Sequence, residues 1–202
     1  MSTPAQRMLV IGEDALSVAL GERLVQACLP DWQLVHPSID TKGVTKLQAA
    51  LPRYLVQAQH VQPVLCVADT DGACPVAWRQ RWLPRPHARM VLRLANTESE
   101  SWLLADREGF ARHLGLPLNK LPWQPDGEPD PKGLILTLAR KSTLRHVRHE
   151  LVSADNPGKP GSGYNLHLVQ FTRQHWSAQA AAEHSPSLQR AMQCLQRLPA
   201  QL

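Results

Sequence analysis

CVADTDGAC, residues 66–74, runs an apolar stretch directly into two aspartates and a glycine. With the residues before it, this stretch predicts a buried strand over Gln62–Asp69. Asp-x-Asp-Gly is a frequent turn sequence, because aspartate bonds nearby backbone and glycine adopts positive φ. Residues two apart also project to the same side of a strand, so Asp69 and Asp71 can share one hard cation. A turn and a metal site are both open interpretations here.

The segments around this strand alternate between strand and helix patterns. Short apolar runs predict three further strands, over Arg7–Gly12, Asp31–Pro37 and Ala88–Ala95. Helices are expected from Asp14 to Cys28, where apolar residues recur every four positions, and over Val44–His60, with a break at Pro52. Alternating strands and helices predict an α/β fold with a mainly parallel sheet flanked by helices.

The chain after residue 95 changes to a helical character. A helix is expected over Glu98–Leu116, and the five prolines of residues 117–131 predict a linker. Beyond it the patterns predict only helices, over Lys132–Leu151, Tyr164–Trp176 and Pro186–Leu198. The predicted organisation is an α/β domain over residues 1–116, the linker, and a helical C-terminal extension over residues 132–202.

Length and cysteine usage restrict the class of protein. The 202 residues are enough for one domain with its own core, with or without a helical appendage. The four cysteines form no CxxC pair, and Cys28 and Cys66 lie in apolar stretches, so free thiols in a reducing compartment are expected. No signal peptide and no run of roughly 18 apolar residues is found. We therefore expect a cytoplasmic protein without membrane contact.

Positive charge is concentrated near the C-terminus. The net charge is +5; residues 1–130 carry 13 Lys+Arg and 14 Asp+Glu, whereas residues 131–202 carry 9 and 3. This asymmetry favours a polyanion such as nucleic acid as partner, with a solvated basic surface as the alternative. The residues expected to face phosphates are Arg140, Lys141, Arg145, Arg148 and, in the glycine-rich loop, Lys159.

Acidic residues follow three of the predicted strands. Glu13 and Asp14 come after the first strand, Asp69 and Asp71 end the third, and Glu98 and Glu100 follow the fourth. Ligands of parallel α/β sheets bind at the carboxyl ends of the strands. Carboxylate oxygens are the ligands that Mg²⁺ prefers, so the acids predict a Mg²⁺ or Mn²⁺ site. Glu13, Glu98 and Glu100 also suit the first turns of helices, which is the structural alternative.

A glutamate after the first predicted strand and an Asp-x-Asp pair after a later one resemble the metal-binding pattern of the Toprim (topoisomerase–primase) superfamily. The segments ESWLLADREGFARHLG (residues 100–115), GKPGSGYN (158–165), FTRQHW (171–176) and SPSL (185–188) are similar to an uncharacterised Toprim-like family of bacterial defence islands, related to the nuclease domains of overcoming-lysogenisation-defect proteins. The resemblance implies that Glu13, Asp69, Asp71 and Glu100 bind metal. It departs from the family at Ile11, where the strand normally ends in glutamate followed by glycine.

The resemblance implies metal-dependent cleavage of DNA or RNA in antiviral defence. It also implies an ABC-type or AAA-type ATPase partner, and a homodimer is compatible with it. Glu13 is the candidate base or ligand, and Lys159 is a candidate cation for the transition-state charge. The aromatic residues Trp102, Phe110, Trp123, Tyr164 and Trp176 are expected to lie in the core, and Tyr164, next to the glycine-rich loop, is the best candidate among them to stack on a base instead.

Two other functions fit parts of the sequence. Glu13 follows the glycine that ends the strand, whereas the family glutamate precedes it. This displacement favours a non-catalytic Toprim-like scaffold that binds an ATPase or nucleic acid. VLCVADTDGA (residues 64–73) also resembles the nucleophile motif of haloacid-dehalogenase-like phosphatases, in which Asp69 would attack phosphate. Those enzymes usually carry the motif near the N-terminus and an acidic pair after a later strand, and this chain shows neither.

Overall fold

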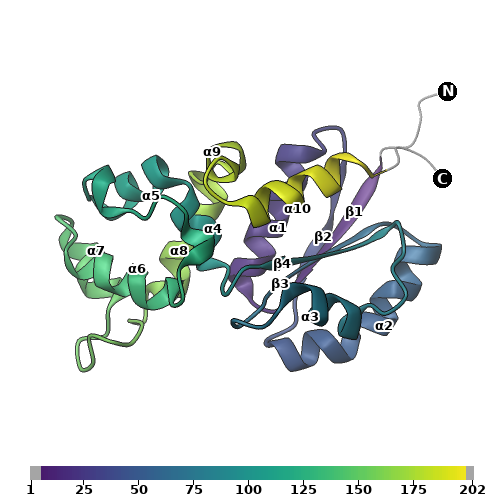
Figure 1. Cartoon of the computed structure of the whole chain (residues 1–202), viewed down its shortest axis with the longest axis horizontal. Helices are drawn as coiled ribbons and strands as arrows, with labels where there is room; N and C mark the ends of the chain where they lie inside the picture. The colour runs from purple at the N-terminus through teal and green to yellow at the C-terminus, as the bar shows by residue number, and fades with distance from the viewer. Residues whose placement is uncertain (1–5, 199–202) are drawn as a thin grey trace.

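A computed structural model describes residues 6–198 and has the α/β architecture that the sequence predicts (Figure 1). Four strands, all parallel, form one sheet in the order β2-β1-β3-β4. They are β1 (Arg7–Gly12), β2 (Gln33–Asp40), β3 (Val64–Asp69) and β4 (Met90–Ala95). The predicted fold class, a mainly parallel sheet flanked by helices with a helical C-terminal extension, is confirmed and is consistent with a Toprim-like arrangement.

Helices cover both faces of the sheet because strand side chains alternate between them. Met8 and Val10 of β1 point into one hydrophobic cluster, with α1 (Ala15–Cys28) and α10 (Pro186–Gln196). Leu9 and Ile11 point into the other, with α2 (Val44–His60) and α3 (Pro75–Trp82). Figure 1 shows α1 and α10 on one side of the strands and α2 and α3 on the other.

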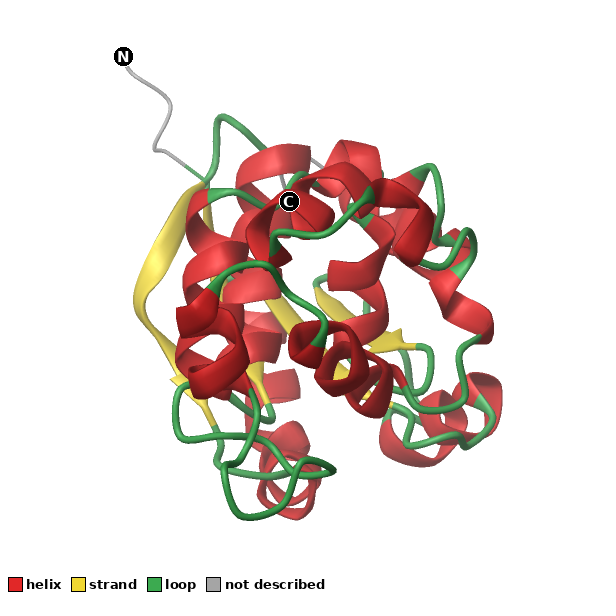
Figure 2. Ribbon diagram, turned by 90° about the vertical axis from the view of Figure 1, so that its left-hand side faces the viewer, coloured by secondary structure: helices red, strands yellow, loops and turns green. Residues whose placement is uncertain are grey.

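The remaining helices gather at one end of the sheet, and the view from that end shows mostly helices in front of the strands (Figure 2). Trp102 and Trp176 are fully buried there, and Nε1 of Trp176 donates to the carbonyl of Trp102 over 2.9 Å. One hydrophobic cluster therefore contains residues from both before and after the segment 117–131. The predicted division of the chain into two domains at this segment stays a prediction. The elements are α4 (Glu100–Ala105), α5 (Arg107–Leu114), η1 (Leu118–Lys120), η2 (Pro125–Gly127), α6 (Pro131–Arg140), α7 (Arg145–Leu151), α8 (Tyr164–Gln174) and α9 (Ala178–Ala182).

Two interruptions that were predicted at prolines are absent from the structure. β2 does not stop at Pro37 but continues to Asp40, because β2 is an edge strand and a missing N–H there need not break a ladder. The helix over Val44–His60 is likewise continuous through Pro52. The short helices α3 and α9 are absent from the sequence prediction.

Two predicted long helices are each divided in the structure. Asp106 separates α4 from α5, where its carboxylate accepts from the backbone N–H groups of Gly109 and Ser177. Residues 141–144 separate α6 from α7. The break between α4 and α5 thus carries a tertiary hydrogen bond to Ser177, which the local sequence pattern does not indicate.

Two smaller features concern the cysteines and the lengths of the helices. All four cysteines are free, and Cys28 and Cys66 are buried. No helix over residues 6–198 is both long and apolar enough to cross a membrane.

Candidate metal centre

Gly12 fixes the sharp entry from β1 into α1. A Cβ at this position would lie 2.8 Å from the backbone nitrogen of Val18 and 2.9 Å from Cβ of Ser17. Only glycine fits this close approach. The carboxylate of Asp14 then accepts from the N–H of Ser17 over 2.8 Å and caps α1. Asp14 is therefore a helix cap, and Glu13 stands between the strand and this cap.

Glu13 and Asp69 are joined across the sheet. Oε1 of Glu13 accepts from the backbone N–H of Asp69 over 2.7 Å. The side chain of Glu13 is buried despite its position after the strand, with 8% of its surface exposed. Although the strand itself ends in isoleucine and glycine, Glu13 thus reaches the place where β3 ends.

Asp71 lies in the turn that follows β3, close to Asp69. The backbone of Asp71 has φ 48° and that of Gly72 has φ 74°, and the N–H of Ala73 donates to the carbonyl of Thr70 over 2.9 Å. Positive φ at both central residues belongs to a tight turn that Asp and Gly tolerate best. The expected strand alternation of Asp69 and Asp71 is therefore wrong, because β3 ends at Asp69.

Glu100 comes from the first turn of α4 and is buried, with 7% of its surface exposed. The hydroxyl of Tyr164 donates to its Oε1 over 3.1 Å. Tyr164 is itself 1% exposed, so the prediction that it stacks on a base is wrong. Ser99, the residue before Glu100, donates its hydroxyl to Oδ1 of Asp69.

The four predicted carboxylates line one cavity of about 440 Å³ at the carboxyl ends of β1 and β3. Glu98, expected to follow the fourth strand with Glu100, also lines it. Its Oε2 accepts from the backbone N–H of Lys132 over 3.0 Å. The remaining lining residues are Asp14, Ala15, Asp40, Lys42, Gly43, Lys132 and Asn165.

Burial and mutual repulsion raise the pKa values of Glu13, Asp69 and Glu100. Desolvation raises the pKa of Glu13 to about 7, and the neighbouring charges of Asp14, Asp71 and Glu100 add to it, against the N–H of Asp69. Desolvation and then Glu98 raise the pKa of Glu100 to about 7. The pKa of Asp69 is raised well above its ordinary value by desolvation and by Glu13. A cation in the cavity would favour the ionised forms.

The chemistry of this donor set fits a hard divalent ion. All candidate ligands are carboxylate oxygens from separate segments, around a cavity with excess negative charge. In the side-chain positions described, each of three carboxylates accepts from a protein donor, and no group of three or more His, Cys, Asp or Glu over residues 6–198 is set at ligating distances. Each of these hydrogen bonds occupies one carboxylate oxygen and leaves the other oxygen of the same group available to Mg²⁺, so ligation requires the side chains to move closer together.

The lysines at the cavity are not the one expected from sequence. Lys159 is exposed in the loop after α7 and is not among the lining residues. Lys42 and Lys132 line the cavity, and Nζ of Lys42 pairs with Asp40 over 2.6 Å. Nζ of Lys132 lies 5.6 Å from the ring centre of Tyr164. Lys132 lies in the first turn of α6, far along the chain from Glu13 and Asp71. No local sequence pattern therefore indicates that it lies near them.

The predicted basic ridge is interrupted. Lys141 does not share a helix with Arg145, because α6 ends at Arg140 and α7 begins at Arg145. A guanidinium nitrogen of Arg148 donates back to the carbonyl of Ser142. Arg140, Lys141 and Arg145 are exposed and line no part of the acidic cavity. A continuous phosphate-facing ridge on one helix is therefore wrong.

Comparisons of the chain with protein-family models, curated protein sequences and solved structures returned no match.

Proposed function

We propose that the acidic cavity binds Mg²⁺ or Mn²⁺ and that the protein is a metal-dependent phosphodiesterase of Toprim type that cleaves DNA or RNA. The observation that carries the proposal is the convergence of Glu13, Asp69, Asp71 and Glu100 on one cavity at the carboxyl end of a parallel sheet. Their places along the chain span 87 positions, from 13 to 100, so no local turn or cap explains the convergence.

These four carboxylates would hold the ion, with water and phosphate oxygens completing its shell. A divalent ion at such a site supplies charge neutralisation for the phosphodiester and activates water. Glu13 is the candidate base or ligand, and its pKa of about 7 belongs to the cavity without metal. Lys132 contributes positive charge for the leaving or bridging phosphate oxygens.

Cleavage assays test this function directly. Purified protein is incubated with plasmid, single-stranded DNA and tRNA in the presence of Mg²⁺, Mn²⁺ or EDTA. We expect cleavage that depends on the metal and is abolished in Asp69→Asn. Asp31→Asn changes an exposed aspartate outside the cavity and is the matched control. Cleavage that persists in Asp69→Asn or in EDTA would contradict the proposal.

The resemblance to defence-island proteins adds context to the proposal. We propose a cytoplasmic antiviral effector that acts with an ABC-type or AAA-type ATPase, and four free cysteines suit that compartment. The cleavage assay is therefore repeated with the ATPase encoded nearby and ATP. Activity that appears only in this mixture would support a partner-activated nuclease.

One observation favours a second candidate, the non-catalytic scaffold. Oxygens of Glu13, Asp69 and Glu100 are engaged by protein donors and form no ligating group as they stand. A scaffold would bind the ATPase or nucleic acid without metal-dependent cleavage. Association without cleavage, alone and with the ATPase, would favour this candidate, whereas p-nitrophenyl phosphate turnover lost in Asp69→Asn would favour the phosphatase.

A further inference from the structure

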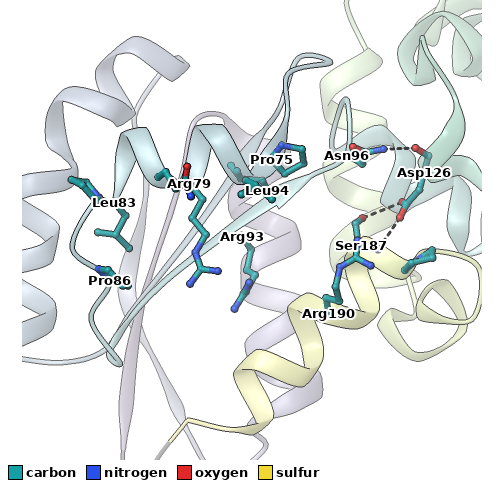
Figure 3. A pocket seen from close by; sticks show the side chains of 14 residues that line it. Pro75, Arg79, Leu83, Pro86, Arg93, Leu94, Asn96, Asp126, Ser187 and Arg190 are labelled. Atoms are coloured by element: carbon teal, nitrogen blue, oxygen red, sulfur yellow. Dashed lines mark hydrogen bonds between the residues drawn. The ribbon is translucent and has the colours of Figure 1, made fainter.

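A second cavity, of about 930 Å³, lies at the β4 edge of the sheet, between α3, β4 and α10 (Figure 3). It shares no lining residue with the acidic cavity. Its volume is in the range of small-molecule sites, roughly 300–1,000 Å³. We call it the arginine cavity, after Arg79, Arg93 and Arg190 in its lining.

The three arginines come from three separate elements. Arg79 lies on α3, Arg93 on β4 and Arg190 on α10. Arg79 and Arg93 extend toward the same space, which Arg190 borders from α10 (Figure 3). Packing of the last helix against β4 thus adds a C-terminal positive charge to two from the N-terminal half.

The positive charge of this cavity is not neutralised within residues 6–198. None of the ion pairs there involves Arg79, Arg93 or Arg190. The lining contains one carboxylate, Asp126, which accepts from the Ser185 hydroxyl and from the N–H and hydroxyl of Ser187.

Arg93 has one side-chain donor left unpaired by the described residues. Its Nε is buried and has no hydrogen-bond partner in the described part of the chain. An unpaired buried donor is unfavourable unless a ligand or water accepts from it. The flat guanidinium fork matches the oxygens of phosphate or carboxylate, and phosphate carries more negative charge.

Six apolar lining residues lie together on one side of the cavity, whereas Gln80, Asn96, Asp126 and Ser187 are polar. Pro75, Val76, Leu83, Pro84, Pro86 and Leu94 line the side formed by α3, the loop after it and β4. Val76 is 64% exposed and therefore accessible to a ligand in the cavity. An apolar wall beside an arginine group suits a ligand with a flat hydrophobic part and a phosphate.

We propose that the arginine cavity binds a nucleotide, with its phosphate on Arg93 and Arg190 and its base against the wall of Leu83 and the prolines. The nucleotide is either free or the phosphorylated end of a nucleic acid strand, since the recognised chemistry is the same. The site is distinct from the metal centre and does not depend on the function proposed above.

Binding is measured by calorimetry on the full chain in EDTA, which removes any contribution of the metal centre. The probes are AMP, ATP, and one short oligonucleotide with either a 5′-phosphate or a 5′-hydroxyl. Binding of AMP or ATP identifies a free nucleotide, and binding of only the 5′-phosphorylated oligonucleotide identifies a strand end. In either case Arg93→Gln and Arg190→Gln should each weaken binding by about tenfold or more.

Arg112→Gln, an exposed arginine of α5 outside the cavity, is the matched control and should bind as the wild type does. Arg190 is exposed, so its replacement keeps the test valid even where Arg93→Gln disturbs folding. Absence of binding by all probes overturns the proposal. So does binding that Arg190→Gln leaves unchanged. Because the assay contains no cleavage step, loss of nuclease activity does not affect its outcome.

Discussion

The backbone N–H of Asp69 donates to Oε1 of Glu13 over 2.7 Å, which links residues 56 positions apart. The bond ties the end of β3 to the residue that follows β1. Each side of the bond depends on the sheet, because β1 and β3 are direct neighbours in it. The acidic cavity is therefore a property of the fold, and its protonation is coupled to stability.

Divalent ions should stabilise the protein, and more so at high pH. Protons and metal compete for the same carboxylates, whose pKa values are raised. Saturating Mg²⁺ is expected to raise the melting temperature by roughly 5 °C at pH 8 and much less at pH 5. Asp69→Asn should abolish the increase, and Asp31→Asn should retain it. Equal melting temperatures with and without metal at pH 8 would contradict the metal site.

In EDTA, stability should fall as pH rises toward and through 7. Glu13 has a pKa raised from 4.5 to about 7, so its stabilising effect is complete below about 4.5 and is lost through pH 7. One unit of pKa shift corresponds to about 1.4 kcal/mol, so a loss on the order of 2 kcal/mol is expected between pH 5 and pH 8. Urea unfolding of Glu13→Gln should show a shallower pH dependence. An unchanged slope would mean that Glu13 is ionised at little cost.

Tyr164→Phe should make Glu100 harder to ionise. The tyrosine hydroxyl lowers the pKa of Glu100, so its removal raises that pKa further. The pH at which Mg²⁺ begins to stabilise the protein should then move upward by about one unit. The control is Tyr54→Phe, which removes a buried hydroxyl on the other face of the sheet. If the pH midpoint of Mg²⁺ stabilisation in Tyr164→Phe equals that of the wild type, Glu100 is not a ligand of the metal.

Lys132 and Lys159 should differ in their effect on cleavage. Lys132 lines the acidic cavity and Lys159 does not. Under the proposed function, Lys132→Gln should reduce the rate about 10²-fold, since one charge-stabilising group is lost. Lys159→Gln should leave the rate within about twofold of the wild type. Single-turnover assays measure both rates. A larger loss in Lys159→Gln than in Lys132→Gln would assign the charge-stabilising role to Lys159 in the glycine-rich loop.

Gly12→Ala should destabilise the fold by about 2 kcal/mol through overpacking. The new Cβ would lie within 3.0 Å of Val18 and Ser17, whereas nothing lies within 4 Å of a Cβ at Gly127. Gly127→Ala is therefore the control, and urea unfolding at one pH compares the two. Equal stabilities would show that α1 can move away from β1 without loss.

The sheet was predictable because its signals are local. The apolar runs that end at Gly12 and Asp69 define β1 and β3, and the register of a parallel sheet brings their ends together. The convergence of Glu13, Asp69 and Glu100 follows from that geometry. Helix ends were less predictable, since Asp106 divides a helix by bonding Ser177 far along the chain.

The parts of the sites that depend on tertiary packing gave no sequence pattern. Lys132 lines the acidic cavity and Tyr164 bonds Glu100 only because α6 packs on α4 and α8 packs on α1. Arg93 had a weak signal, a charged residue within the apolar strand MVLRLA. Its grouping with Arg190 depends on α10 crossing β4, which the sequence pattern of neither segment indicates.

The hydrogen bond from Tyr164 to Glu100 joins residues 64 positions apart and so can form only late in the synthesis of the chain. Glu100 leaves the ribosome 64 residues before its donor, and the α8 segment that carries the donor must emerge before it can pack on α1. The acidic cavity therefore gains this hydrogen bond only after most of the chain has been synthesised.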